Sequence, residues 1–325
     1  MSKDAGETSI HHRLSLERIA EATRVIDPVF LNSPQYRAEP LESHLGCRVV
    51  VKVETINPIR SFKGRGAEYL VSTLEGGPHL VCATAGNFGQ GMAFAARTRG
   101  LPLTIFTSAD ANPLKIARMR ALGADVRPVG ADYDDAHRAA SAFAEQVGGR
   151  LVEDGRDRAI AEGAGTIGVE LLRWPEAFDD ILVPLGDGAL LGGVARWVKA
   201  HHPSTRVIGV VAAGAPAMER SWRAGRAQAL DWGDTIADGI AVRAPFAEAV
   251  TDLIGLVDDM LLVKDDQMVS AMRLAFTELG IVLEPSGAAG LAALLTNPTQ
   301  FSGRLTATIL TGGNITPAQM KQWLA

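Results

Sequence analysis

One lysine lies where a strand-like run gives way to a helical pattern. Lys63 stands between Phe62 and Gly64 in the stretch NPIRSFKGRGAEYL, residues 57–70. Most lysines are solvent-exposed surface residues, and that is the simplest interpretation of this one. A lysine at the start of a helix can also present its amine to an aldehyde and form a Schiff base. The residues that the chain brings to the same place decide between the two.

Three glycine-rich segments follow strand-like runs. LGDGALLGG (185–193) comes directly before a helical pattern, so its amides and the helix N-terminus could cradle a phosphate. ATAGNFGQG (83–91) could hold a carboxylate, and its Asn87 could hydrogen-bond an oxygen on a ring or a substrate. LTGGN (310–314) offers the neutral hydroxyl of Thr311. Each segment alone is also compatible with a tight turn or a helix cap, and none has the Walker spacing. Together with the lysine, they are the parts needed to hold pyridoxal 5'-phosphate.

Alternating strands and helices must position these segments. Apolar strand-like runs are followed by helical patterns, which predicts parallel, doubly wound sheets. In such sheets ligands bind at the carboxyl ends of the strands. A chain of 325 residues with 47% hydrophobic content is expected to form two α/β open-sheet domains. We predict a large domain from residues 1–53 and 149–325, and a small domain from residues 54–148. The expected strands cover residues 47–54, 79–84, 101–107, 124–129, 179–185, 205–213, 254–263 and 304–311.

Composition and charge argue against several classes of function. The net charge is −5 and no basic run carries interleaved aromatics, so nucleic acid is not an expected partner. No stretch is apolar over the length of a membrane span, and the first residues lack the apolar segment of a secretory signal. The two cysteines, Cys47 and Cys82, have no metal-type spacing and fit a reduced, cytoplasmic setting. No metal site is expected.

Seven motifs occur in the order in which a known family has them. They are SFKGRGA, TAGNFGQG, IAEGAGTIGVELL, PLGDGALLGG, IADGIAV, LEPSGAAGLAAL and LTGGN. From about residue 15 to its C-terminus the chain resembles the fold-type II pyridoxal-phosphate enzymes. Within them it is most similar to the threonine/serine dehydratase (threonine ammonia-lyase) branch, to which serine racemase is related. The resemblance implies pyridoxal 5'-phosphate as cofactor, an architecture like the tryptophan synthase β-subunit, and a homodimer or homotetramer.

The resemblance also implies roles for individual residues. Lys63 would be the catalytic residue that binds the cofactor covalently. The other implied cofactor-binding residues are Asn87 at the 3'-oxygen, Gly186, Asp187, Gly188, Ala189 and Leu190 in the phosphate loop, Thr311 at the pyridine nitrogen, and Gly239, Glu284 and Asn314 lining the cofactor side. The implied substrate-binding residues are Thr84, Ala85, Gly86, Asn87 and Phe88.

The implied reaction is β-elimination from a β-hydroxy amino acid such as threonine, serine or phenylserine, giving a 2-oxo acid and ammonia. Lys63, displaced by the substrate amine, would take the α-proton as general base. The β-hydroxyl would leave after protonation by the cofactor phosphate or a nearby group. The neutral hydroxyl of Thr311 would leave the ring nitrogen largely unprotonated, which favours prompt loss of the leaving group over a long-lived carbanion.

Several positions depart from the family's usual pattern. Ala85 stands where serine racemases have the serine that acts as second base, which argues against efficient racemisation. Residues 211–213 (Val-Ala-Ala) lack the acidic residue of metal-dependent relatives. Asp187 brings a carboxylate into the phosphate loop, which is unfavourable unless the side chain points away. Phe88 replaces a frequent histidine and is expected to reshape the pocket wall.

The segment LVEDGRDRAIAEG (151–163) corresponds to one that lines the substrate side chain in relatives. Its charged residues Glu153, Asp154, Arg156 and Arg158 favour a solvated loop, because charges are seldom buried unpaired. The alternative is that the segment faces the pocket and selects a substrate larger or more polar than threonine.

Three other functions stay open as alternatives. Pyridoxal-phosphate-dependent β-replacement is disfavoured because cysteine synthases carry a Gly-Asn-Thr-Gly loop, whereas residues 86–89 read Gly-Asn-Phe-Gly. An amino-acid racemase is the second alternative. A non-catalytic ligand-binding module is the third, and the intact motif around Lys63 argues against it.

Overall fold

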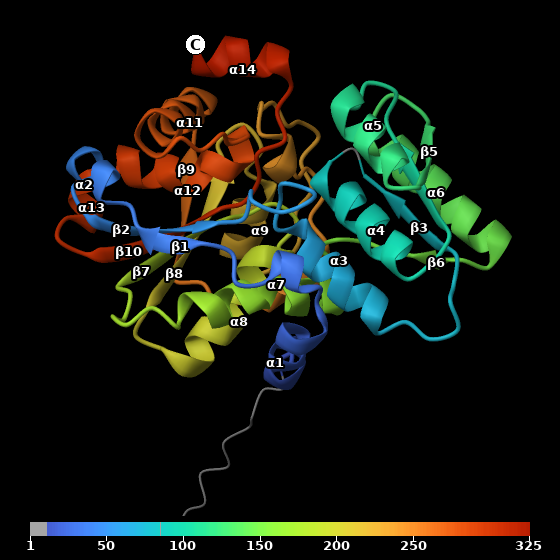
Figure 1. Ribbon diagram of the computed structural model, residues 1–325, viewed down its shortest axis with the longest axis horizontal. Helices are drawn as coiled ribbons and strands as arrows, with labels where there is room; N and C mark the ends of the chain where they lie inside the picture. The colour runs from blue at the N-terminus through green and yellow to red at the C-terminus, as the bar shows by residue number, and fades with distance from the viewer. Residues whose placement is uncertain (1–11, 85) are drawn as a thin grey trace, which may run out of the picture.

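Two sheets organise the chain, which a computed structural model describes over residues 12–84 and 86–325 (Figure 1). The larger sheet has six strands in the order β1-β2-β10-β7-β8-β9, and only the β1–β2 pair is antiparallel. The smaller sheet has four parallel strands in the order β5-β4-β3-β6. The strands of the larger sheet are β1 (Gln35–Arg37), β2 (Arg48–Val53), β7 (Asp180–Pro184), β8 (Arg206–Ala212), β9 (Asp259–Val263) and β10 (Leu305–Leu310). Those of the smaller sheet are β3 (Leu80–Ala83), β4 (Leu103–Thr107), β5 (Asp125–Pro128) and β6 (Arg150–Leu151).

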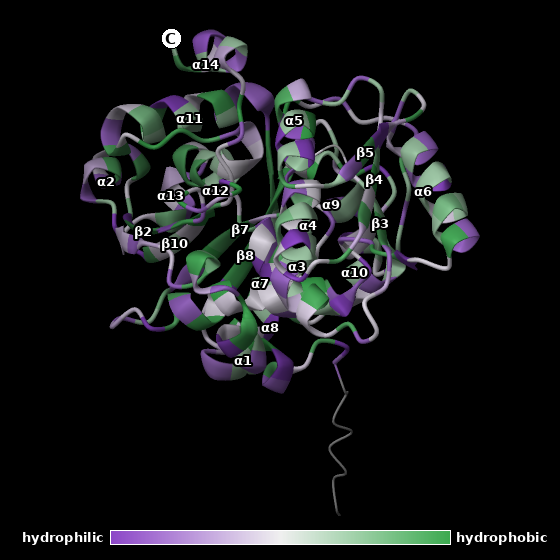
Figure 2. Ribbon diagram, turned by 45° about the vertical axis from the view of Figure 1, so that its right-hand side comes forward, coloured by the Kyte–Doolittle hydropathy of each residue, from purple (hydrophilic) through white to green (hydrophobic). Residues whose placement is uncertain are grey.

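Helices cover both faces of the larger sheet. One face packs against α2 (Glu39–Leu45), α11 (Asp265–Leu279) and α12 (Pro285–Thr296). The other face packs against α7 (Arg158–Leu171) and α8 (Ala189–His201). Successive residues of the central strands therefore enter apolar cores on opposite sides, and β7 and β8 are coloured hydrophobic in Figure 2. Burial on both faces explains why these strands are continuous apolar runs rather than alternating ones.

The smaller sheet is covered in the same way. Helices α3 (Lys63–Ser72), α4 (Asn87–Thr98) and α5 (Pro113–Ala121) contribute to the core on one side. Helix α6 (Tyr133–Val147) packs on the other side through Ala136, Ala140 and Ala144. Because α3 also packs along α7 of the larger sheet, the two sheets share a helical layer between them (Figure 1).

The remaining elements complete the surface. They are α1 (Leu16–Val25), η1 (Pro28–Phe30), α9 (Ala217–Ala224), η2 (Asp238–Ile240), α10 (Ala247–Leu253), α13 (Pro298–Phe301) and α14 (Pro317–Leu324). Helix α1 packs on α7 and α8. None of the helices described is both long and apolar enough to cross a bilayer.

The α/β class with two doubly wound open sheets is confirmed, and all eight expected strands are present. The strand expected to begin at residue 254 begins at Asp259, because α10 ends at Leu253 and Gly255, with φ of +78°, turns the chain in between. The edge strands β1 and β6 were not predicted, since each has three residues or fewer. The domain division at residues 54–148 remains a prediction. Strand β6 of the smaller sheet, at Arg150–Leu151, lies just after the end of the predicted small domain.

Candidate active site

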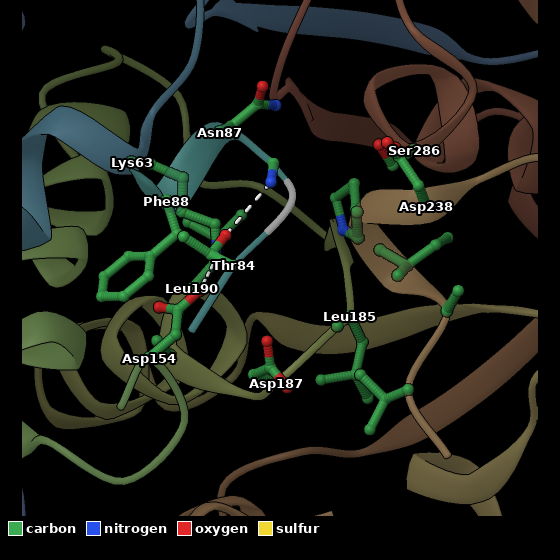
Figure 3. A pocket seen from close by; sticks show the side chains of 18 of the residues that line it. Lys63, Thr84, Asn87, Phe88, Asp154, Leu185, Asp187, Leu190, Asp238 and Ser286 are labelled. Atoms are coloured by element: carbon green, nitrogen blue, oxygen red, sulfur yellow. Dashed lines mark hydrogen bonds and ion pairs between the residues drawn. The ribbon is translucent and has the colours of Figure 1, made fainter. Parts of the chain in front are cut away.

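A cavity of about 270 Å³ lies where the loops after β3, β6, β7 and β10 meet (Figure 3). Strands β3 and β6 belong to the smaller sheet and β7 and β10 to the larger one, so both sheets contribute to its wall. The cavity therefore lies at the carboxyl ends of the strands, where open α/β sheets bind their ligands.

Lys63 is the first residue of α3, and its side chain points into this cavity (Figure 3). Only 14% of the side chain is exposed. Its Nζ forms an ion pair with the carboxylate of Asp154 and lies 4.8 Å from the centre of the Phe62 ring. The interpretation of Lys63 as an ordinary surface lysine is therefore wrong.

Glycines allow the backbone around Lys63 to pack closely. A Cβ on Gly64 would lie 2.3 Å from the Phe30 ring. A Cβ on Gly91, in α4, would lie 2.8 Å from the carbonyl oxygen of Lys63. Neither distance leaves room for a side chain, so the glycines fix where α3 presents the lysine.

The loop between β7 and α8 forms a cradle of backbone groups. Gly188 precedes the first turn of α8 with φ of +100°, a conformation that favours glycine. A Cβ on Gly186 would lie 2.6 Å from the carbonyl oxygen of Gly239. Residues 186–191 line the cavity, so the N-terminus of a 13-residue helix opens into it. Such a helix end binds anions through its free amides and its dipole.

A second wall is a chain of hydrogen-bonded side chains. Asn87, the first residue of α4, donates its amide to the carboxylate of Glu284 and accepts from Asn314 Nδ2 at 2.8 Å. Lys115 Nζ lies 2.5 Å from Asp238 Oδ2 and 3.7 Å from Glu284 Oε2. Burial raises the pKa of Glu284, and the positive charge of Lys115 opposes that shift. Glu284 Oε2 is buried and has no hydrogen-bond partner.

Two neutral hydroxyls lie at strand ends. Thr311, directly after β10, is buried with its Oγ1 3.5 Å from the carbonyl oxygen of Ser286. Thr84, directly after β3, accepts a hydrogen bond from the amide of Gly86 at 3.1 Å. Both residues line the cavity, so it offers uncharged hydroxyl groups at two places.

Two carboxylates, those of Asp154 and Asp187, also line the cavity (Figure 3). Burial and, after it, the negative charge of Asp154 raise the pKa of Asp187 to about 6, although Lys63 opposes the shift. The Asp187 side chain lines the cavity rather than pointing away from it. The direction of this shift agrees with the conflict expected for a carboxylate in an anion-binding loop, because burial and the charge of Asp154 both disfavour the ionised form.

The interpretation of residues 151–163 as a solvated loop is wrong for its two acidic residues Glu153 and Asp154. Asp154 lines the cavity, and Glu153 is buried, with Oε1 2.7 Å from His137 Nε2. Arg156 and Arg158 are exposed, as expected of a solvated loop. Nothing in the local sequence separates the two acidic residues from the two basic ones, because only contacts with distant segments decide which side chains turn inward.

The structure brings the predicted site residues together. All of those that it describes line the cavity, except that Asn314 lies behind Asn87. Ala85 lies outside the described residues. The roles of the individual predicted site residues stay predictions. The charged or phenolic residues of the cavity wall that sequence reasoning missed are Lys115, Tyr133, Asp134, Asp238 and Arg243, whereas Asp154 belongs to the segment for which the pocket-facing alternative was kept open. Over residues 12–84 and 86–325, no three His, Cys, Asp or Glu side chains are grouped to hold a metal ion.

Comparison with known proteins decides the family. Residues 26–312 match the family described as pyridoxal-phosphate dependent enzyme. This chain belongs to that family. The L-threonine ammonia-lyase of Thermotoga maritima is 34% identical over 93% of this chain and 76% of its own length. The L-threo-3-hydroxyaspartate ammonia-lyase of a Pseudomonas species is 31% identical over 93% of this chain and 95% of its own. The crystal structure of a T.th. threonine deaminase has a TM-score of 0.88 and 34% identity, covering 93% of this chain and 99% of that one.

These relationships confirm the threonine ammonia-lyase branch of the fold-type II enzymes. The chain is a pyridoxal-phosphate-dependent ammonia-lyase, an enzyme that works by β-elimination. The cavity fits this cofactor. It offers an amine, an anion cradle that side chains would fill, and a buried acceptor, Glu284 Oε2, without a partner.

Proposed function

We propose that the protein removes water from a β-hydroxy amino acid and releases a 2-oxo acid and ammonia, with Lys63 as the residue that moves the α-proton. The observation that carries this proposal is the placement of the Lys63 amine inside the cavity, beside a glycine cradle and two neutral hydroxyls. When bound, pyridoxal phosphate withdraws negative charge from the substrate Cα.

The chain's own residues would divide the remaining work. The amides of residues 186–190 would hold the cofactor phosphate. Asn87, whose amide donates a hydrogen bond to Glu284, would orient the cofactor ring. The hydroxyl of Thr311 would face the pyridine nitrogen. The loop of residues 84–88 would bind the substrate carboxylate through amides at the start of α4. Lys63 would then accept the α-proton as general base.

The charges of the cavity wall favour a substrate with a neutral side chain. Five acidic and three basic side chains line the cavity. The basic ones are already paired, since Lys115 contacts Asp238, Lys63 contacts Asp154, and Arg243 Nη2 lies 3.0 Å from Asp134. A second substrate carboxylate would meet excess negative charge. Threonine, serine or phenylserine are therefore preferred to a 3-hydroxy dicarboxylic acid.

We also propose a homodimer or homotetramer that works in the cytoplasm. Both cysteines are buried free thiols, which suits a reducing compartment. Light scattering of the purified protein measures the assembly state.

The experiment that tests the proposed function has two parts, one for the cofactor site and one for the substrate. The purified protein is reduced with borohydride, and the modified peptide is located by mass spectrometry. The wild-type protein is then assayed with L-threonine, L-serine, L-phenylserine and L-threo-3-hydroxyaspartate for 2-oxo acid and ammonia. A pyridoxyl group on Lys63 and turnover of the first three acids are expected. A reduced adduct elsewhere, or turnover of none of the four, would overturn the proposal.

A further inference from the structure

Asp154 is the residue in direct contact with the lysine that moves the α-proton. Its Oδ2 accepts from Lys63 Nζ. Its Oδ1 is buried and has no hydrogen-bond partner. The side chain is 9% exposed and lines the cavity, as Figure 3 shows. A carboxylate in this place can exchange a proton with the lysine and has a second oxygen free to meet a substrate.

The loop that carries Asp154 is held firmly. Glu153 N–H donates to Asp157 Oδ2 at 2.8 Å, and Asp157 N–H donates to the carbonyl oxygen of Glu153 at 2.9 Å. A Cβ on Gly155 would lie 2.5 Å from the carbonyl oxygen of Asp187, so this loop packs directly on the cradle loop of the other sheet. None of these contacts involves Lys63. The position of Asp154 therefore does not depend on its contact with Lys63 alone.

Loss of a β-hydroxyl needs an acid, because hydroxide is a poor leaving group. We propose that Asp154 is the catalytic acid that protonates the departing β-hydroxyl. The proposal rests on the β-elimination proposed above. Lys63 Nζ takes the proton from Cα, passes it to the carboxylate of Asp154, and Asp154 delivers it to the β-oxygen. The electrons of the broken Cα–H bond form the Cα–Cβ double bond, the Cβ–O bond breaks with its electron pair on oxygen, and water leaves. One proton is moved and none is added from outside.

The other acidic side chains that line the cavity are less suited to protonating the departing β-hydroxyl. Asp187 makes no hydrogen bond to Lys63 among the contacts described, and it belongs to the loop that cradles the anion. Burial and the charges of Asp187 and Glu153 raise the pKa of Tyr133, which makes its phenol a weaker acid. Asp134 is paired with Arg243 at 3.0 Å. Asp238 is paired with Lys115 at 2.5 Å.

The test compares two substrates that differ only in what the leaving group needs. L-Serine must lose a protonated hydroxyl, whereas β-chloro-L-alanine loses chloride, which needs no proton. In the Asp154→Asn and Asp154→Ala variants, kcat/KM for L-serine is expected to fall roughly 10²- to 10⁴-fold. The value for β-chloro-L-alanine is expected to stay within about threefold of wild type. Glu153→Gln, a change in the neighbouring buried carboxylate that does not line the cavity, is the matched control and should leave both substrates unaffected.

Further readouts separate this role from a structural one. The dissociation constant for pyridoxal phosphate, followed by visible absorbance, and the thermal midpoint of the Asp154→Asn protein should match those of wild type. If both substrates lose activity together, Asp154 only positions Lys63 and the proposal is wrong. If neither loses activity, another group supplies the proton and the proposal is also wrong. If wild type itself turns over neither substrate, the β-elimination proposal fails first, so the two failures are distinguishable.

Discussion

Arg65 and Glu170 meet through two hydrogen bonds, of 2.7 and 2.9 Å, with both side chains buried. Arg65 lies two positions after Lys63 on α3, and Glu170 lies on α7, which packs on the larger sheet. The same guanidinium binds both oxygens of Glu54, at 2.9 and 2.8 Å. This network links the helix that presents the lysine to the end of β2 and to α7.

Removing the guanidinium should destabilise the protein strongly. Arg65→Met leaves Glu54 and Glu170 buried without their shared partner, and we expect the free energy of unfolding to fall by about 3–5 kcal/mol. Urea unfolding followed by circular dichroism measures this. Arg37→Met is the control, because Arg37 pairs with Glu42 on the surface, and it should cost under about 1 kcal/mol. Equal losses in the two variants would show that the buried network has no special importance.

The pH dependence of stability should report on Glu170. Burial alone would raise its pKa, but the hydrogen bonds and charges of Arg65 and Lys52 lower it to about 2. The unfolded chain has the ordinary value of 4.5. A lowered folded-state pKa contributes stability that is present above pH 4.5 and is lost as the pH falls towards 2.

The urea midpoint of wild type should therefore fall more steeply between about pH 5 and pH 3 than that of Glu170→Gln. The variant should be less stable than wild type at pH 7, since Arg65 and Lys52 lose a charged partner. Parallel pH profiles for the two proteins would contradict this account of the pKa.

Two neighbouring glycines of α8 should respond in opposite ways to alanine. A Cβ on Gly193 would lie 2.0 Å from the carbonyl oxygen of Ala161 in α7, whereas nothing comes closer than 3.6 Å to a Cβ on Gly192. Gly193→Ala should therefore separate α7 from α8 and cost about 1–3 kcal/mol. Gly192→Ala should stabilise the protein by up to about 1 kcal/mol, because alanine favours a helix interior. Thermal unfolding of the pair measures both. A Gly193→Ala protein as stable as wild type would mean that the two helices do not pack this closely.

The sequence by itself determined the alternation of strands and helices, the α/β class and most of the residues of the site. It could do so for a physical reason. Strands buried on both faces are continuous apolar runs, and the turns at their carboxyl ends need glycine where backbone must approach a ligand or another loop. Lys63, the loop at residues 185–193 and the hydroxyl of Thr311 all stand at such junctions, so their positions along the chain implied their proximity in space.

Only the tertiary structure decided which charged side chains face the cavity. Asp154 and Arg156 lie two residues apart in one charged segment, yet Asp154 enters the cavity and Arg156 is 57% exposed. That difference accompanies the packing of Gly155 on Asp187, a contact between segments that the sequence does not pair. The short strand β6, which starts this loop, is held by pairing with β3 across about seventy residues of chain. Interactions over such separations leave no local pattern, because each depends on where the rest of the fold places its partner.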